Sequence, residues 1–160
     1  NMDIRVGTGF DVHKFGEGKC LRLCGVDISF DKKLVGHSDA DVGLHALTDA
    51  LLGSVAQGDL GRWFPPSEEQ WKDSNSSIFL EFALNKVNEQ GFLISNIDLT
   101  IICEKPKILL HAENMQIRLS ELLKIESNRI NIKATTTEKL GFTGREEGIA
   151  ALCSVSLLKP

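Results

Sequence analysis

The chain has little that would attach it to a membrane or to nucleic acid. No apolar run approaches the roughly 20 residues needed to span a bilayer. Lysine and arginine together number 18 against 22 acidic residues, and the net charge is −4. Proteins that bind nucleic acid non-specifically carry a basic surplus instead. We therefore expect neither a nucleic-acid nor a membrane partner, and any anionic ligand must be held by local groups.

The chain also lacks closely spaced cysteine pairs. Its four cysteines show no C-x-x-C spacing of the kind found in cysteine zinc sites. Cys20 and Cys24 lie in an apolar stretch, so we expect both thiols to be buried. The residues from Asn1 to Gly9 have no basic head followed by an apolar core, as a signal peptide would. These features predict a cytoplasmic protein with reduced cysteines.

Two nucleotide-binding motifs are missing as well. Gly18-Lys19 lacks the other elements of a P-loop, and Gly7-x-Gly9 lacks the third glycine of a dinucleotide fingerprint. No internal repeat or low-complexity linker divides the 160 residues, a length that fits one domain. We predict a single domain over residues 1–160.

Strand and helix patterns alternate along the chain. The first helix has apolar residues at helical spacing, Ser38 and Asp41 as a variant capping box, and Gly58 at its end. A long polar loop over 62–75 follows, and such loops are often functional. The order predicts an α/β fold of the α+β sandwich type, with helices packed on one side of a mixed sheet. The expected strands are 4–13, 21–30, 97–103, 129–135 and 149–158, and the expected helices are 39–57, 77–90 and 106–124.

One group of residues has the composition of a metal site. Asp11 and His13 are two apart on a predicted strand and so point to the same face. His45 lies within the first helix, with Asp41 and Asp49 four residues to either side. Asp11, His13 and His45 would together supply three ligands and leave a fourth position open, as in catalytic zinc sites. We expect one of the two aspartates to accept a hydrogen bond from the ring N–H of His45 that does not face the metal.

A second group favours phosphate chemistry. Thr135, Thr136 and Thr137 offer hydroxyl groups to phosphate oxygens, and Glu138 offers the oxygen ligand that Mg²⁺ prefers. The segment Lys105–Lys107, at a predicted helix start, suggests an anion site. Each of these features alone also fits a plainer interpretation: a polar strand face, a histidine in the core, a threonine-rich strand end or a solvated turn.

Taken together, the motifs resemble a single family. The likeness covers essentially the whole chain in the same order and is most specific in the run Ala134 to Arg145. The chain is similar to the 2-C-methyl-D-erythritol 2,4-cyclodiphosphate synthases of the non-mevalonate isoprenoid pathway. The residues that carry the resemblance are Gly9–His13, His37–Asp41, Leu44–Gly53, Gly58–Gly61 and Lys133–Gly148.

The resemblance implies an intramolecular reaction. The 2-phosphate of 4-diphosphocytidyl-2-C-methyl-D-erythritol 2-phosphate would attack the β-phosphorus of its own diphosphate, and CMP would leave. No water is consumed, so the enzyme would be a phosphorus–oxygen lyase. Positioning and charge neutralisation should dominate such a reaction, because the reacting groups are phosphates.

The resemblance also implies roles for individual residues. Asp11, His13 and His45 would bind Zn²⁺, and Glu138 would bind a second divalent cation, Mg²⁺ or Mn²⁺. His37 and Thr136 would be catalytic, stabilising the transition state. The implied substrate contacts are Asp11, His13, His37, Ser38, Asp59, Gly61, Phe64, Glu68, Cys103, Pro106, Lys107, Leu109, Thr135, Thr136, Glu138, Phe142 and Arg145.

Members of the family are homotrimers with active sites between neighbouring subunits. Some hold an isoprenoid diphosphate in a cavity on the three-fold axis, near the positions of Phe10 and Arg145. Glu68 stands near a loop position where members commonly have aspartate. Two alternatives are a zinc phosphoesterase with the same three ligands, and a protein that binds cytidine nucleotide or isoprenoid diphosphate without catalysis. Release of inorganic phosphate would favour the first, and CMP binding without turnover the second.

Overall fold

The computed structural model describes residues 1–160. Its main sheet contains β1 (Asp3–Glu17), β4 (Lys32–Val35), β5 (Leu93–Ile102), β6 (Ile130–Thr135) and β7 (Gly148–Lys159). The strand order is β4-β1-β7-β5-β6. Only β5 and β6 pair in parallel, and the other pairs are antiparallel. The predicted mixed sheet is therefore confirmed.

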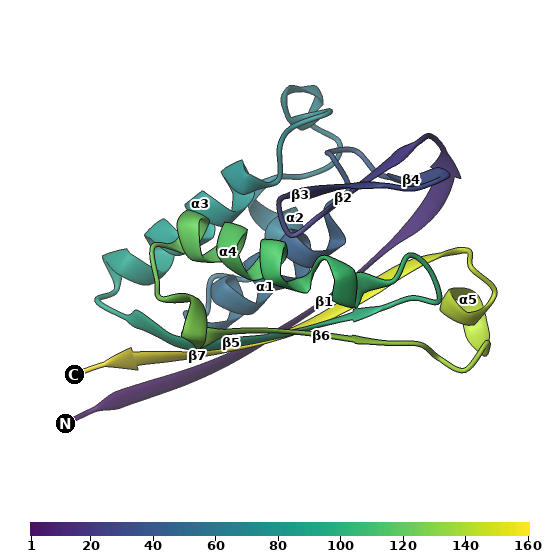
Figure 1. Cartoon of the computed structure of the whole chain (residues 1–160). Coiled ribbons are helices and arrows are strands. Elements are labelled where there is room, and N and C mark those ends of the chain that lie inside the picture. Colours follow the sequence, from purple (N-terminus) through teal and green to yellow (C-terminus); the bar gives the residue numbers. More distant parts are fainter.

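Three long helices cover one face of this sheet (Figure 1). They are α1 (Val42–Ser54), α3 (Ser77–Glu89) and α4 (Ala112–Leu123). A connected core of 33 buried residues fills the space between helices and sheet, as the predicted sandwich requires. None of the helices combines the length and apolar character needed to cross a membrane. The shorter helical elements are α2 (Leu60–Trp63), α5 (Gly141–Gly144) and the 3-10 turns Glu69–Trp71, Ile108–Leu110 and Ser127–Arg129.

α1 lies directly against the backbone of β1. A Cβ atom on Gly9 would be 1.9 Å from the carbonyl oxygen of Ala46, and one on Gly7 would be 2.0 Å from that of Ala50. Only glycine allows so close an approach. The contact brings the middle of α1 beside the strand residues that follow Gly9.

The opposite face of the sheet carries exposed apolar side chains on its central strands. Side chains alternate along a strand, so the even-numbered residues of β1 around Gly7 and Gly9 point away from α1. Phe10 pairs in register with Leu152 of β7. We call the following set the open face: Ile4, Val6, Phe10, Val12 and Leu152, of which Val6 is 69% exposed and Phe10 58% exposed.

The predicted strand over residues 21–30 is wrong. It is a hairpin of β2 (Cys20–Leu23) and β3 (Val26–Ser29), which form a separate two-stranded sheet. Cys24 and Gly25 both have positive φ angles, as the central residues of a type I′ hairpin turn do. Cys24 is buried as expected, whereas Cys20 is exposed. Apolar residues stand on both sides of the turn and at Cys24, so the turn is marked only by Gly25 and by a shift of the alternation from odd to even positions.

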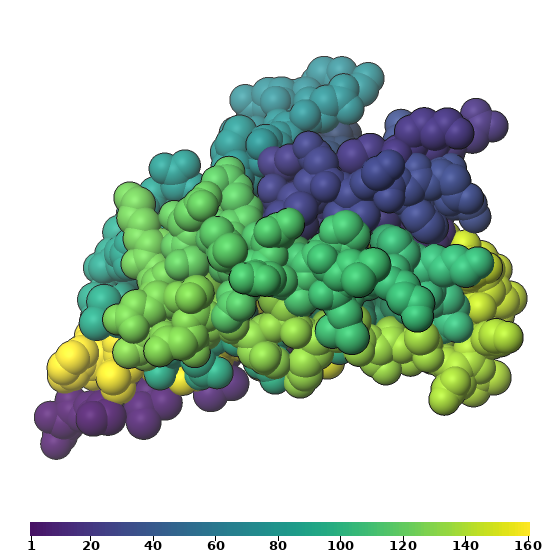
Figure 2. All heavy atoms as spheres, viewed as in Figure 1, coloured from purple at the N-terminus to yellow at the C-terminus, as the bar shows by residue number.

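The hairpin and α4 lie side by side over the sheet, as the space-filling view shows (Figure 2). A Cβ atom on Gly25 would be 2.9 Å from the side chain of Arg118 in α4. Asp41, just before α1, also fixes the hairpin turn. Its carboxylate accepts hydrogen bonds from the backbone N–H groups of Cys24 and Gly25, both at 2.8 Å.

Two predicted helix starts are wrong. The first helix begins at Val42, because the Asp41 carboxylate, and not Ser38, caps it by accepting from the N–H of Leu44. The third begins at Ala112, after a cis Lys105–Pro106 bond and a 3-10 turn. Lys105–Lys107 thus precedes a 3-10 turn and not the α-helix, so the argument for an anion site from free α-helix N–H groups fails.

Candidate functional site

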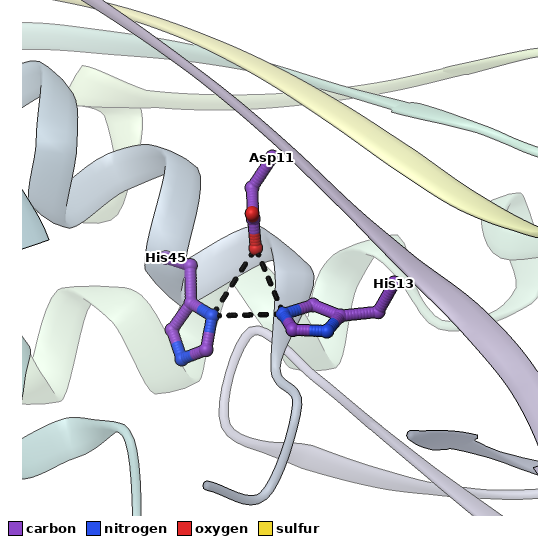
Figure 3. A group of neighbouring side chains, drawn as sticks. All are labelled: Asp11, His13 and His45. Carbon is purple, nitrogen blue, oxygen red and sulfur yellow. Dashed lines mark hydrogen bonds and ion pairs between the residues drawn. The ribbon is translucent and has the colours of Figure 1, made fainter. Parts of the chain in front are cut away.

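Asp11 and His13 of β1 meet His45 of α1 (Figure 3). The Asp11 Oδ2 atom lies 3.0 Å from His13 Nε2 and 3.1 Å from His45 Nδ1, and the two ring nitrogens are 3.0 Å apart. These ligand atoms all lie within 4.8 Å of one another. Two imidazole nitrogens and a carboxylate oxygen form a donor set that suits zinc and related divalent cations. The group therefore fits a divalent metal, and we call it the metal group.

The surroundings of Asp11 and His13 shift the pKa values of both side chains. Burial disfavours the ionised form of Asp11, but hydrogen bonds to His13 and His45 outweigh it and lower the Asp11 pKa to about 2. Burial also disfavours the charged form of His13, yet Asp11 outweighs it and raises the His13 pKa above its usual value. The Nδ1 atom of His13 lies 3.0 Å from the carbonyl oxygen of Val35. A proton on Nδ1 would satisfy that carbonyl and leave the Nε2 lone pair facing the metal position.

The expected partner of His45 is wrong. Its Nε2 atom lies 2.8 Å from Ser76 Oγ and 3.2 Å from Ser38 Oγ, not against an aspartate. Asp41 caps α1 instead, and Asp49 accepts a 2.7 Å hydrogen bond from the first backbone N–H of α2. Helical spacing predicted that both aspartates lie on the His45 side of α1. It could not show that backbone N–H groups would already occupy their carboxylates.

A cavity of about 340 Å³ opens beside the metal group. Eight of the residues predicted for the site line it together, from four separate stretches of the chain. These are Asp11, His13, His37, Ser38, His45, Asp59, Gly61 and Phe64. The other lining residues are Asp49, Leu60, Pro66, Trp71 and Phe79.

An aromatic cluster holds the 62–75 loop beside this cavity. The Phe64 ring centroid lies 4.8 Å from that of Trp71 and 4.6 Å from that of Phe79. Glu68 does not line the cavity; its carbonyl oxygen is 3.0 Å from His37 Nε2, and its carboxylate accepts from Trp71 Nε1 at 2.8 Å. Sequence reasoning missed Trp71 and Phe79. A usable signal was the concentration of both tryptophans and three of the eight phenylalanines between residues 63 and 82.

A second cavity, of about 240 Å³, lies where the parallel strands β5 and β6 end. All six predicted residues of this region line it: Cys103, Pro106, Lys107, Leu109, Thr135 and Thr136. Burial raises the pKa of Cys103 to about 12, so its thiol is neutral and acts as an apolar part of the wall. The cavity thus combines one amine, from Lys107, and one carboxylate, from Glu104, with hydroxyl and apolar groups.

Four predicted residues line neither cavity: Glu68, described above, and Glu138, Phe142 and Arg145. Glu138 is exposed, as are Phe142 and Arg145, and the Arg145 guanidinium pairs with Glu147 at 2.8 Å. The two cavities share no lining residue within one chain. A larger cavity, of about 690 Å³, lies between α3, α4 and the start of β5, and no histidine or cysteine lines it.

Comparisons with known proteins agree on one family. A family model described as the YgbB family matches residues 4–158. The 2-C-methyl-D-erythritol 2,4-cyclodiphosphate synthase of Cereibacter sphaeroides is 56% identical over 99% of this chain and 99% of its own length. A solved structure described as IspF from Plasmodium falciparum in a CDP complex has a TM-score of 0.86 and 33% identity, and the match covers 98% of this chain and 96% of that one.

Some relatives are longer. The bifunctional enzyme IspD/IspF of Paracoccus denitrificans is 58% identical over 99% of this chain, which spans only 42% of that protein. The chain thus spans less than half the length of the bifunctional relatives it matches. On these matches, the chain belongs to the YgbB family, that of the 2-C-methyl-D-erythritol 2,4-cyclodiphosphate synthases.

Proposed function

We propose that the chain converts 4-diphosphocytidyl-2-C-methyl-D-erythritol 2-phosphate into 2-C-methyl-D-erythritol 2,4-cyclodiphosphate and CMP. A 2-phosphate oxygen forms a bond to the β-phosphorus, and the bond from that phosphorus to CMP breaks, so CMP leaves with the electron pair. The observation that carries this proposal is the convergence of Asp11, His13 and His45 beside a cavity in a chain 56% identical to a named synthase.

Zn²⁺ is the proposed occupant of the metal group, and Mg²⁺ or Mn²⁺ the proposed second cation at Glu138. When bound, such cations would neutralise phosphate charge and polarise phosphate oxygens. The chain itself holds the ligands in place: the ionised Asp11, with His13 Nε2 and His45 Nδ1, leaves one side of the metal position open toward the cavity. This arrangement suits an anionic substrate on a chain of net charge −4.

The two cavities suggest a division of the substrate. The cavity at the metal group would take the methylerythritol phosphate part, through Ser38, Asp59 and Gly61, with His37 and Phe64 beside it. The cavity at the ends of β5 and β6 would take the cytidine diphosphate part, with Thr136 near the phosphates. That a related structure is described as a CDP complex supports this assignment. The remaining proposed contacts are Glu68, Cys103, Pro106, Lys107, Leu109, Thr135, Glu138, Phe142 and Arg145.

A homotrimer is part of the proposal. The open face is large, apolar and uncovered in one chain, as interfaces between subunits commonly are. Glu138, Phe142 and Arg145 line neither cavity of their own chain, which suits a site completed by a neighbour. An isoprenoid diphosphate could lie between copies near Phe10 and Arg145. We further propose that residues 1–160 act as one domain, since one core connects its helices and main sheet; a cytoplasmic location stays a prediction.

The decisive assay incubates the protein with the diphosphocytidyl substrate, Zn²⁺ and Mg²⁺. Formation of CMP and the cyclic diphosphate in equal amounts is the expected result. Inorganic phosphate as the main product would identify a phosphoesterase instead, and CMP binding without turnover would identify a non-catalytic binding protein.

His45→Ala should remove the metal and the activity while leaving a folded chain. The change deletes one of three ligands, and metal stoichiometry by elemental analysis should fall from one zinc per chain to a small fraction. His111→Ala is the matched control, because the His111 side chain makes no capping hydrogen bond at the start of α4. Full zinc occupancy in His45→Ala would show that the ligand set is wrong.

A further inference from the structure

The outer nitrogen of His45 leads into a chain of buried hydrogen bonds. Its Nδ1 atom faces Asp11 and His13, so Nδ1 must offer its lone pair to a metal held by the group. The single proton of a neutral imidazole then resides on Nε2 and needs an acceptor. The nearest is Ser76 Oγ at 2.8 Å, and Ser76 is fully buried at the start of α3.

The Ser76 hydroxyl group continues this chain of hydrogen bonds. Once its hydroxyl oxygen accepts from His45, its O–H donates to Oδ1 of Asp39, with which Ser76 Oγ is in close contact. The backbone N–H of Ser76 donates to Asp39 Oδ2 at 3.0 Å, and that of Asp41 donates to Oδ1 at 3.1 Å. Asp39 pairs with no lysine or arginine. Its carboxylate therefore remains free to polarise the hydroxyl.

We propose that Ser76 and Asp39 are positioning residues for the metal group, acting through a His45–Ser76–Asp39 relay. The proposal rests on the metal group of the proposed function. A carboxylate that accepts from a ligand's outer N–H, here through a serine, selects the tautomer, fixes the ring orientation and makes the ring a stronger donor to the metal. The relay also links α1, which contains His45, to Ser76, the residue that caps the start of α3, and to Asp39 in the segment before α1.

Ser38 is a weaker candidate for the same task. Its Oγ atom is farther from His45 Nε2, at 3.2 Å, and already accepts a bond from the N–H of Ala40 at 3.3 Å. No carboxylate accepts from Ser38. Ser76 therefore provides the path to a charge, and Ser38 provides a second contact at most.

The test measures zinc affinity of the full chain by competition with a chelator. Ser76→Ala and Asp39→Asn should weaken zinc binding by about ten- to hundredfold, the usual effect of removing such a partner. Thr48→Val is the matched control, because it removes a buried 2.7 Å hydrogen bond to the Leu44 carbonyl within α1 but touches no part of the relay. It should lower the unfolding temperature and leave zinc affinity within about twofold.

A spectroscopic measurement separates the relay from simple destabilisation. In the zinc-loaded protein, ¹⁵N NMR should show the His45 proton on Nε2 and slow to exchange with water, and Asp39→Asn should accelerate that exchange. Unchanged zinc affinity in Asp39→Asn, or a His45 Nε2 proton that exchanges as fast before the change as after it, would overturn the relay. If Ser76→Ala does not fold, the nearly isosteric Asp39→Asn decides. Full zinc occupancy in His45→Ala would refute the metal group itself, an outcome separate from these.

Discussion

At the scale of single residues, protons and a metal compete for His13. The pKa of His13 is raised by Asp11, and that of Asp11 is lowered to about 2, so the carboxylate stays ionised while His13 titrates. Because only neutral imidazole binds metal, affinity should fall as the pH drops through the raised pKa of His13. The fall should begin at a higher pH than for an ordinary histidine.

Zinc affinities measured at several pH values between 8 and 6 check this expectation. The apparent affinity should decline toward pH 6 by about tenfold per unit once His13 is mostly protonated. An affinity that stays constant over this range would contradict it. Because the Asp11 pKa is about 2, protonation of its carboxylate should cause no further loss of zinc affinity above about pH 4.

The ligands themselves could be predicted from sequence, but their supports could not. Strand alternation placed Asp11 and His13 on one face, and the helical pattern placed His45 inside α1. Ser76 gave no signal, because a serine before a helix is common and its partner Asp39 lies 37 residues away. Such contacts depend on how α3 packs against α1, which no local pattern encodes.

At the scale of elements, the contact between β1 and α1 can be tested with two glycine substitutions of opposite effect. Gly9→Ala would force a Cβ to within 1.9 Å of the Ala46 carbonyl oxygen. The strand must move away from α1, at a cost of about 1–3 kcal/mol in unfolding free energy, and Asp11 and His13 must move with it. Zinc affinity should fall as well.

Gly53→Ala is the matched control in the same pair of elements. A Cβ on Gly53, in α1, would have nothing within 4 Å. Alanine is the better helix former, so the variant should gain about 0.5–1 kcal/mol and keep its zinc affinity. Chemical denaturation of both variants measures the difference, and a Gly9→Ala protein as stable as the unmodified one would show that the contact is not tight.

Helices and strands could be predicted where a distinct apolar spacing or a turn residue marks them, and not where apolar residues continue from one element into the next. The helix over α1 was recognised by its apolar spacing, but its predicted end at Gly58 is wrong, because the helix ends at Ser54. The glycine at position 91 correctly marked the end of α3. The β2–β3 hairpin was missed because apolar residues stand on both sides of Cys24 and Gly25. The start of α1 was misplaced because three possible capping residues, Ser38, Asp39 and Asp41, precede it, and only tertiary contacts select Asp41.

At the scale of the whole molecule, the open face should control assembly. Val6→Lys places a charge on a side chain that is 69% exposed in the single chain, so it should hardly change the stability of that chain. In a trimer joined through this face the charge would be buried, and the subunits should separate. Sedimentation velocity should show trimers for the unmodified protein and monomers with little activity for the variant.

Ile78→Lys serves as the control for that substitution. Ile78 lies on α3, on the far side of the sheet from the open face, and is 47% exposed. The control should remain trimeric and active. Trimers in Val6→Lys at the same concentration, or monomers in the unmodified protein, would refute an assembly through the open face.

The general architecture followed from the order of predicted elements, and the helices do lie on one side of a mixed sheet. Assembly could not be derived in this way. The alternation along residues 4–12 is apolar on one face, but a sequence does not say whether a further layer of its own chain or another copy covers that face. In the structure no helix packs there (Figure 1).

The spacing of the three metal ligands along the chain bears on the order in which the site can form. Asp11 and His13 are neighbours, whereas His45 is 32 residues beyond His13. An unfolded chain therefore presents two of the ligands together and the third only at the entropic expense of closing a loop. Docking of α1 onto the two glycines of β1 closes that loop. The folded backbone thus brings the three ligands together before the metal binds. Tight metal binding would therefore indicate that β1 and α1 have packed against each other.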